Sequence, residues 1–214
     1  RIGVGFTGLG NALTMLKLRY DREDGRQMAA EIGRRMRDAA YRASVELAKE
    51  KGAFPKFNAQ GYLAEGTFAS RLPADIQADI RQHGIRNCYM LTQAPTGTTS
   101  LLAGVNSGIE PYFDFDYLRS DRTGDYSVTS TWADLYGSPE RPEWLVAAND
   151  IKPEEHVYMQ AAAQRFELSR SIVVLDLLAV MRDRIDQAIA RELTLGDQVP
   201  QHTGALAVVQ GVAL

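Results

Sequence analysis

The residues best suited to chemistry in this chain belong to one short segment, residues 94–100, which reads APTGTTS. A strand-like apolar run at residues 89–92 precedes it, and an apolar stretch that could open a helix follows it. The first turn of a helix has unpaired backbone N–H groups and the positive end of the dipole, so an anion binds well there. Hydroxyls add donors, and a glycine lets a ligand approach the backbone closely. The pattern favours a phosphate-binding loop, and its candidate residues are Pro95, Thr96, Gly97, Thr98, Thr99 and Ser100.

A second interpretation of this segment needs no ligand. Threonine and serine residues also cap helices, and proline and glycine also build turns. The segment is then a capped helix start after a turn. From local chemistry alone, both interpretations stay open.

The longer string QAPTGTTSLLAGVNSGIEP, residues 93–111, resembles the part of the ribonucleotide reductase large chain that holds the substrate's diphosphate. The sequence of this loop is most similar to that of the adenosylcobalamin-dependent branch, class II. Other stretches resemble the same family in the same order, at residues 1–9, 37–52, 84–87 and 153–162. The resemblance extends over about residues 1–165, and Asn106 and Cys88 depart from the family pattern.

The resemblance implies an α/β fold, part of the family's ten-stranded α/β barrel, incomplete and with helices outside the strands. It implies reduction of a ribonucleoside diphosphate to its 2′-deoxy form by a radical mechanism, with adenosylcobalamin as cofactor and a thioredoxin-type reductant. The family's catalytic cysteines, glutamate and asparagine precede the matched part, and Cys88 is the one cysteine here. We therefore expect a fragment with no catalytic residue of its own, inactive alone, that associates with the missing barrel half or forms a homo-oligomer.

Composition limits the other possibilities. The chain has 214 residues, 45% of them hydrophobic and 24% charged, with a net charge of −3. That balance gives no electrostatic footprint for nucleic acid or for an acidic membrane surface. No apolar run approaches the length that spans a membrane. A single cysteine cannot form an internal disulfide, which favours the cytoplasm.

Periodicity and turn residues predict the order of elements. Apolar residues mostly four apart predict a long amphipathic helix over residues 25–51, with Gly52 as its end. The other expected elements are a strand over residues 1–9, a helix over 11–20, a loop-rich stretch over 53–72, a helix from Pro73 through His83, a strand over 88–92, a hairpin around 121–124 and a helix from Pro153.

Two regions are expected along the chain. Residues 1–168 form the barrel portion, and residues 169–214 form a divergent helical tail where the resemblance stops. Residues 204–214 are apolar and free of charge, so they need a partner surface.

Other candidate sites are weaker. The spacing Gly3-x-Gly5-x-x-Gly8 imitates a dinucleotide-binding fingerprint, but almost no strand precedes it. The histidines are far apart and none has metal-ligand spacing to Cys88. Glu110 lies between a glycine-containing turn and a proline, where it either accepts a hydrogen bond in an active site or holds the turn.

Two further functions remain open beside ribonucleotide reduction. One is a non-catalytic nucleotide- or phosphate-binding module derived from the same family. The other is an unrelated oxidoreductase that binds a dinucleotide at the N-terminal glycines.

Overall fold

The computed structural model describes residues 1–121, 124–130, 132 and 141–166. Most of the regular structure in these ranges is helical. The helices are Leu9–Met15 (α1), Glu23–Lys51 (α2), Ala59–Tyr62 (α3), Ala74–His83 (α4), Gly97–Ala103 (α5) and Pro153–Gln164 (α7), with short 3-10 turns at Ala69–Arg71 (η1) and Ala148–Asp150 (η2). The strands are Asp116–Asp121 (β1) and Gly124–Thr129 (β2). None of the helices described combines the length and the apolar character needed to cross a membrane.

The long helix α2 organises the molecule and confirms the prediction for residues 25–51. Its first turn carries Glu23 and Asp24 and its last turn carries Lys49 and Lys51, so both ends match the helix dipole. Gly52 ends the helix with φ +77°, a conformation that favours glycine.

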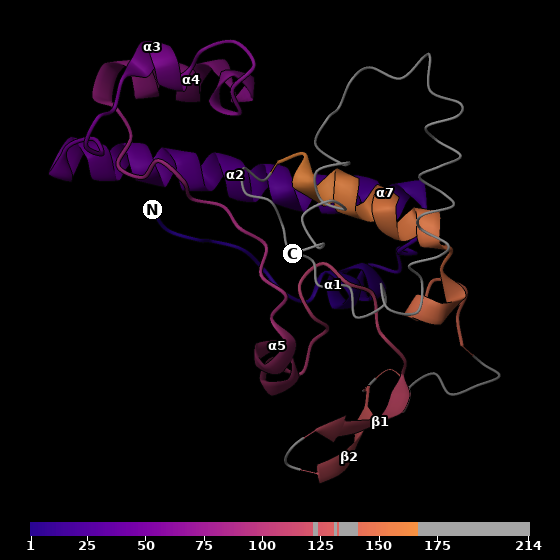
Figure 1. Cartoon of the computed structure of the whole chain (residues 1–214). Coiled ribbons are helices and arrows are strands. Elements are labelled where there is room, and N and C mark those ends of the chain that lie inside the picture. Colours follow the sequence, from indigo (N-terminus) through magenta and orange to yellow (C-terminus); the bar gives the residue numbers. More distant parts are fainter. Residues whose placement is uncertain (122–123, 131, 133–140, 167–214) are drawn as a thin grey trace, which may run out of the picture.

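Two hydrophobic cores form on α2, where α7 and α4 lie along it (Figure 1). Helix α7 packs against α2 where Gly33 lies close to Ala163 and Phe166, and Arg26 pairs with Glu155. Helix α4 packs nearer the end of α2. The core between α4 and α2 includes Ile76 and Ile80 of α4 and Tyr41 and Val45 of α2, and each of these side chains is at most 1% exposed. The helix from Pro153 is thereby confirmed, and so is the helix ending at His83, with Pro73 as its N-cap.

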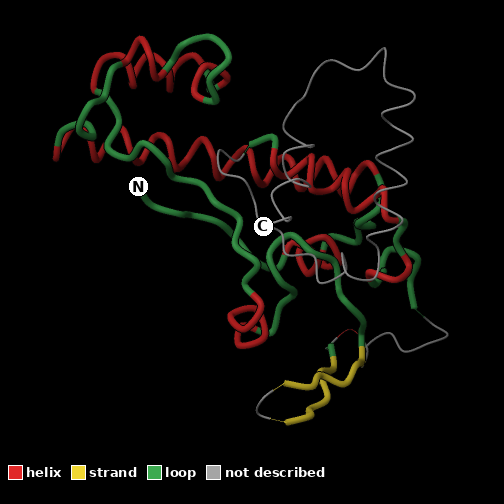
Figure 2. The backbone as a smooth tube through the Cα atoms, viewed as in Figure 1, coloured by secondary structure: helices red, strands yellow, loops and turns green. Residues whose placement is uncertain are grey.

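The two extended segments that precede α1 and α5 run side by side in parallel (Figure 2). Val4 donates its N–H to Met90 O at 2.7 Å and accepts from Thr92 N at 3.0 Å, and Ile2 N donates to Tyr89 O at 3.1 Å. The predicted strands over residues 1–9 and 88–92 therefore pair, but only through one isolated bridge. Parallel segments joined across helices are typical of α/β folds. A closed barrel is not formed by the residues that the structure describes.

Gly5 is required by this parallel pairing. A Cβ atom at Gly5 would lie 2.1 Å from the carbonyl oxygen of Thr92, far inside contact distance. The glycine therefore serves close backbone approach between two segments. The N-terminal glycines thus have a packing role that requires no dinucleotide.

The predicted hairpin is confirmed. Strands β1 and β2 pair antiparallel from Asp116 opposite Thr129 to Asp121 opposite Gly124. The hairpin extends away from the helices (Figure 1). It is the one sheet within the described ranges.

One prediction needs correction, one is refined, and one falls outside the described residues. The first helix spans Leu9–Met15 instead of residues 11–20. It cannot continue to residue 20, because Lys17 adopts φ +58°, which is incompatible with a right-handed helix. Residues 53–72, expected to be rich in loops, are mostly loop and turn and also contain α3 and η1, where Asn58 caps α3 by accepting from Gly61 N. The tail predicted over residues 169–214 lies outside the described residues.

Candidate functional site

The predicted phosphate-binding loop enters α5 through an unusual backbone conformation at Thr96. This residue is the N-cap of α5 and adopts φ +55° and ψ +26°, in the left-handed region that residues other than glycine rarely occupy. Its carbonyl accepts the N–H of Ser100 at 2.7 Å, which closes the first turn. Helix α5 therefore begins at Gly97, as the sequence interpretation required.

Hydroxyl groups hold this conformation from a distant part of the chain. Thr7 Oγ1 lies 2.9 Å from Thr96 Oγ1 and also donates to Asn106 O at 2.9 Å. The N–H of Gly108 points between the two threonines, at 3.0 Å from Thr7 Oγ1 and 2.8 Å from Thr96 Oγ1. The Thr96 hydroxyl is thus engaged inside the protein.

Ser100 is engaged in a similar way. It is 2% exposed, and its hydroxyl donates to Gly97 O at 2.9 Å while lying 2.9 Å from Ser107 Oγ. Because a hydroxyl has one proton, Ser107 must be the donor in that second contact. The Ser100 side chain therefore stabilises the helix start and has no proton left for a ligand.

Gly97, Thr98 and Thr99 present the free donors. All three residues are exposed, and no described residue accepts a hydrogen bond from their backbone N–H groups or from the two threonine hydroxyls. Pro95 is exposed as well, but it has no N–H to donate. The loop thus offers three amides and two hydroxyls on the positive end of a helix.

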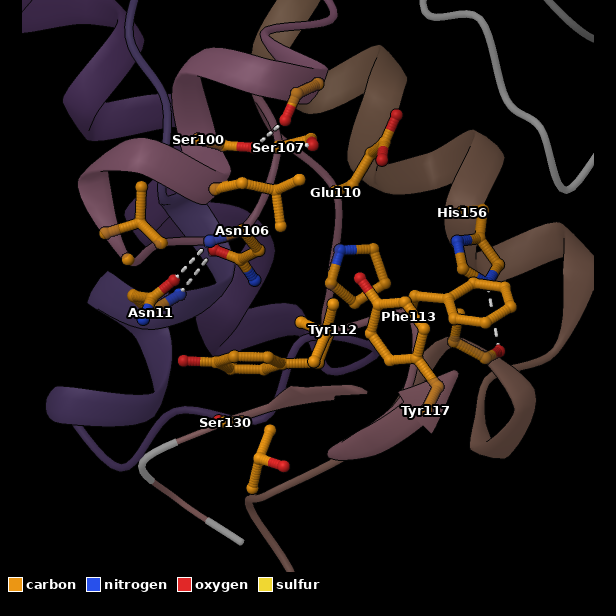
Figure 3. A pocket seen from close by; sticks show the side chains of 18 residues that line it. Asn11, Ser100, Asn106, Ser107, Glu110, Tyr112, Phe113, Tyr117, Ser130 and His156 are labelled. Atoms are coloured by element: carbon orange, nitrogen blue, oxygen red, sulfur yellow. Dashed lines mark hydrogen bonds between the residues drawn. The ribbon is translucent and has the colours of Figure 1, made fainter. Parts of the chain in front are cut away.

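A cavity of about 300 Å³ adjoins the loop, between α5, the segment that follows it and the hairpin (Figure 3). Gly97 and Ser100 line it, whereas Thr98 and Thr99 do not. Phe113 and Tyr117 form an edge-to-face pair on another wall, with ring centroids 5.1 Å apart. The lining residues in the described ranges include no lysine or arginine, so its polar contacts come from neutral groups and one carboxylate.

Asn11 and Asn106 fix the opposite side of the cavity by a reciprocal pair of hydrogen bonds (Figure 3). Asn11 N donates to Asn106 Oδ1 at 3.0 Å, and Asn106 N donates to Asn11 Oδ1 at 2.7 Å. The Nδ2 group of Asn106 is buried and has no partner among the described residues. Asn106 is therefore built into the support of the loop.

His156 lines the cavity from the first turn of α7 and is 7% exposed. Burial lowers the pKa of this imidazole, although the carbonyl of Ala148, 3.4 Å from Nε2, partly offsets the effect. The ring is therefore neutral near pH 7. Tyr20, its neighbour at 6.1 Å, is buried and donates to Ile109 O at 2.8 Å, and burial also raises the pKa of Tyr20.

The remaining candidate residues do not assemble a catalytic group. Glu110 lines the cavity, and its N–H donates to Ser107 O at 2.9 Å, as a turn residue does. Cys88 is half-buried, and His83 ends α4. His202 lies outside the described residues. Within the described ranges, no three His, Cys, Asp or Glu side chains gather as a metal site would require.

Sequence reasoning missed the residues that support the loop. Thr7 and Asn11 lie 89 and 95 residues from their partners Thr96 and Asn106. Neither threonine nor asparagine at such separations carries a local signal, because only the fold brings them together.

Comparison with known proteins gives a family for this arrangement. Residues 1–174 match the family described as ribonucleotide reductase, barrel domain. The chain is 34% identical over 192 residues to the vitamin B12-dependent ribonucleoside-diphosphate reductase of Mycobacterium tuberculosis, covering 77% of this chain and 25% of that protein.

Other relatives carry related names. The ribonucleoside-diphosphate reductase subunit alpha of Treponema pallidum is 32% identical over 73% of this chain and 20% of its own length. The vitamin B12-dependent ribonucleoside-diphosphate reductase of Thermoplasma acidophilum is 26% identical over 78% of this chain and 23% of its own length. The chain thus spans about a quarter of the length of these relatives.

Proposed function

This chain belongs to the family of ribonucleotide reductase barrel domains, and on that premise we propose that it binds the diphosphate of a ribonucleoside diphosphate during reduction to the 2′-deoxy form. The relatives' names give the reaction and the substrate class. The place of binding is the loop of residues 95–100, which resembles the family's diphosphate loop.

One observation carries this proposal: the backbone amides of Gly97, Thr98 and Thr99 lack partners in the described structure and open α5. Peptide dipoles aligned along a helix place partial positive charge at such amides, and phosphate oxygens accept from them. The Thr98 and Thr99 hydroxyls add two donors of the same kind. A diphosphate would therefore be held by neutral donors.

Within the loop the six candidate residues take different parts. Gly97, Thr98 and Thr99 donate to the phosphate oxygens. Thr96 and Ser100 shape the loop, because their hydroxyls are already engaged with the protein. Pro95 sets the chain direction before Thr96 through its fixed φ.

The adenosylcobalamin-dependent type is suggested by the relatives named vitamin B12-dependent. When bound, that cofactor supplies radical chemistry in such an enzyme. The cavity beside α5 measures about 300 Å³, the lower end of the range for small-molecule sites, and adenosylcobalamin is far larger than a ligand of that size. These residues do not fit the cofactor, so none of them is assigned to it.

The chain's part in the reaction is binding and orientation of substrate. Cys88 is its one cysteine, and a single thiol cannot form the dithiol that a thioredoxin-type reductant recharges. We expect no deoxyribonucleotide from this chain alone. The parallel segments at Val4 and Leu91 would be neighbouring strands of a ten-stranded barrel. Another polypeptide segment or another copy of the chain would complete this barrel. We place the protein in the cytoplasm.

Isothermal titration tests the proposal with three ligands: cytidine diphosphate, inorganic pyrophosphate and cytidine. The first two should bind and cytidine should not, because the loop recognises phosphate oxygens. Binding of cytidine as tight as that of its diphosphate would overturn the proposal, and so would absence of binding by both phosphate ligands.

A non-catalytic phosphate-binding module is the second candidate, because the described residues that line the cavity beside the loop include no cysteine. The two functions separate when the chain is mixed with a reductase of the family that lacks the corresponding segment. Restored deoxyribonucleotide formation supports the reductase. Phosphate binding without restored activity supports the module.

A further inference from the structure

We propose that Thr7 is the positioning residue of the phosphate-binding loop: its hydroxyl accepts the Thr96 proton and thereby sets the direction of the amides at Gly97–Thr99. This inference rests on the proposed function of the loop. Thr7 contacts no phosphate in this proposal and acts only through Thr96.

Counting protons fixes the direction of each hydrogen bond. Thr7 donates its one hydroxyl proton to Asn106 O at 2.9 Å. In the contact of 2.9 Å between Thr7 and Thr96, Thr96 must therefore be the donor. Gly108 N donates to both oxygens, so Thr7 uses its proton and both lone pairs. Thr96 in turn has no proton left for a phosphate.

Only one of the Thr7 contacts lacks a substitute. Asn106 O also accepts from Gly8 N at 3.0 Å, so it stays paired without Thr7. Gly108 N keeps Thr96 Oγ1 at 2.8 Å. The Thr96 hydroxyl, in contrast, has Thr7 as its acceptor among the described residues. Loss of the Thr7 hydroxyl therefore affects Thr96 more than it affects the rest of the fold.

The conformation of Thr96 makes this contact important for binding. A non-glycine residue at φ +55° is held there at a cost of about 1 kcal/mol or more, which surrounding contacts must offset. The peptide planes that follow Thr96 carry the N–H groups of Gly97 and Thr98. If Thr96 relaxes to negative φ, those groups no longer converge on one ligand.

The experiment uses the full 214-residue chain and inorganic pyrophosphate as ligand, measured by isothermal titration. Four changes are compared: Thr7→Val, Thr7→Ser, Thr96→Gly and the double change Thr7→Val with Thr96→Gly. Thr7→Val should weaken binding about fivefold to tenfold, the loss of one hydrogen bond. Thr7→Ser should restore it, because serine keeps the hydroxyl.

The double change separates positioning from general stability. If Thr7 acts through Thr96, the double change weakens binding no more than Thr96→Gly alone. Glycine also adopts positive φ readily, so Thr96→Gly keeps the fold even if Thr7→Val does not. Ser44→Ala is the matched control, because Ser44 is 2% exposed and its hydroxyl bonds Asn87 in the other core. It should lower the melting temperature and leave affinity unchanged.

Four results would each overturn the role of Thr7 and leave the proposed function standing. The affinity for pyrophosphate could be unchanged in Thr7→Val, or it could fall in Thr7→Ser or in Ser44→Ala as much as it falls in Thr7→Val. The fourth result is that the losses of affinity add in the double change. Absence of pyrophosphate binding by the unaltered chain would overturn the proposed function and this inference together.

Discussion

Asn11 and Asn106 each accept the other's backbone N–H, at 2.7 and 3.0 Å, across 95 residues of sequence. This reciprocal pair joins α1 to the segment that leaves α5. Thr7 contacts Thr96 just before α5. The residues on both sides of α5 are therefore attached to the N-terminal part of the chain. The proposed phosphate-binding loop is therefore held by tertiary contacts in addition to its own local hydrogen bonds.

Asn106→Ala should destabilise the protein by about 1–3 kcal/mol, because it leaves the half-buried N–H of Asn11 without an acceptor. Urea unfolding measures the free energy. Asn58→Ala is the control, since Asn58 caps only the short, exposed helix α3, and it should cost about 1 kcal/mol or less. Equal losses in both variants would argue against a supporting role for the pair.

Gly97→Val should weaken pyrophosphate binding at least about tenfold, because a side chain there occupies the space in front of the loop amides. The fold should tolerate it: a Cβ atom at Gly97 meets nothing within 4 Å, and its φ is not positive. The free energy of unfolding should change by less than about 1 kcal/mol, as expected for a surface substitution. Retained affinity in a folded variant would exclude these amides as the site.

Gly5→Ala should have the opposite effect on the fold. The new Cβ would lie 2.1 Å from Thr92 O, a backbone atom that cannot move aside without separating the parallel segments. We expect a loss of about 3 kcal/mol or more, or failure to fold. Thermal unfolding followed by circular dichroism measures it, and a melting temperature like that of the unaltered chain would contradict the parallel pairing.

Stability should fall as the pH drops through about 6.5, the ordinary pKa of histidine. Burial holds the pKa of His156 below that value in the folded state. Between the two pKa values the unfolded chain therefore binds more protons, and protonation favours unfolding. Above that window both states are neutral at this residue and the effect vanishes.

His156→Gln tests this pH dependence by urea unfolding at pH 7.5 and 5.5. The variant should lose less stability between the two pH values than the unaltered chain does. Ser44→Ala, which removes a buried hydroxyl and no titratable group, is the control and should show the same pH dependence as the unaltered chain. An equal loss in the His156 variant would contradict the burial of a neutral ring.

Local signals predicted most of the helices. The apolar pattern of α2 and Gly52 lie within one continuous stretch, so periodicity and the terminating glycine were sufficient to predict this helix. The hairpin likewise depended on its own glycine turn. Where a non-glycine residue takes a positive φ, as Lys17 does, the helix end was misplaced, because no sequence rule indicates that conformation.

The candidate site was predictable only in part. The residues of the loop were identified from hydroxyls, glycine and family resemblance. Their division into free donors and engaged hydroxyls was not, because the engagement of Thr96 depends on Thr7, which lies 89 residues away in the sequence. The same holds for His156, whose burial arises from the packing of α7.

Nuclear magnetic resonance titration of the ¹⁵N-labelled chain with pyrophosphate tests the central claim most directly. The amide resonances of Gly97, Thr98 and Thr99 should shift most, and the same titration of Gly97→Val should leave them nearly unchanged. Shifts confined to other parts of the chain, with these three amides unaffected, would contradict the assignment of the loop as the diphosphate site.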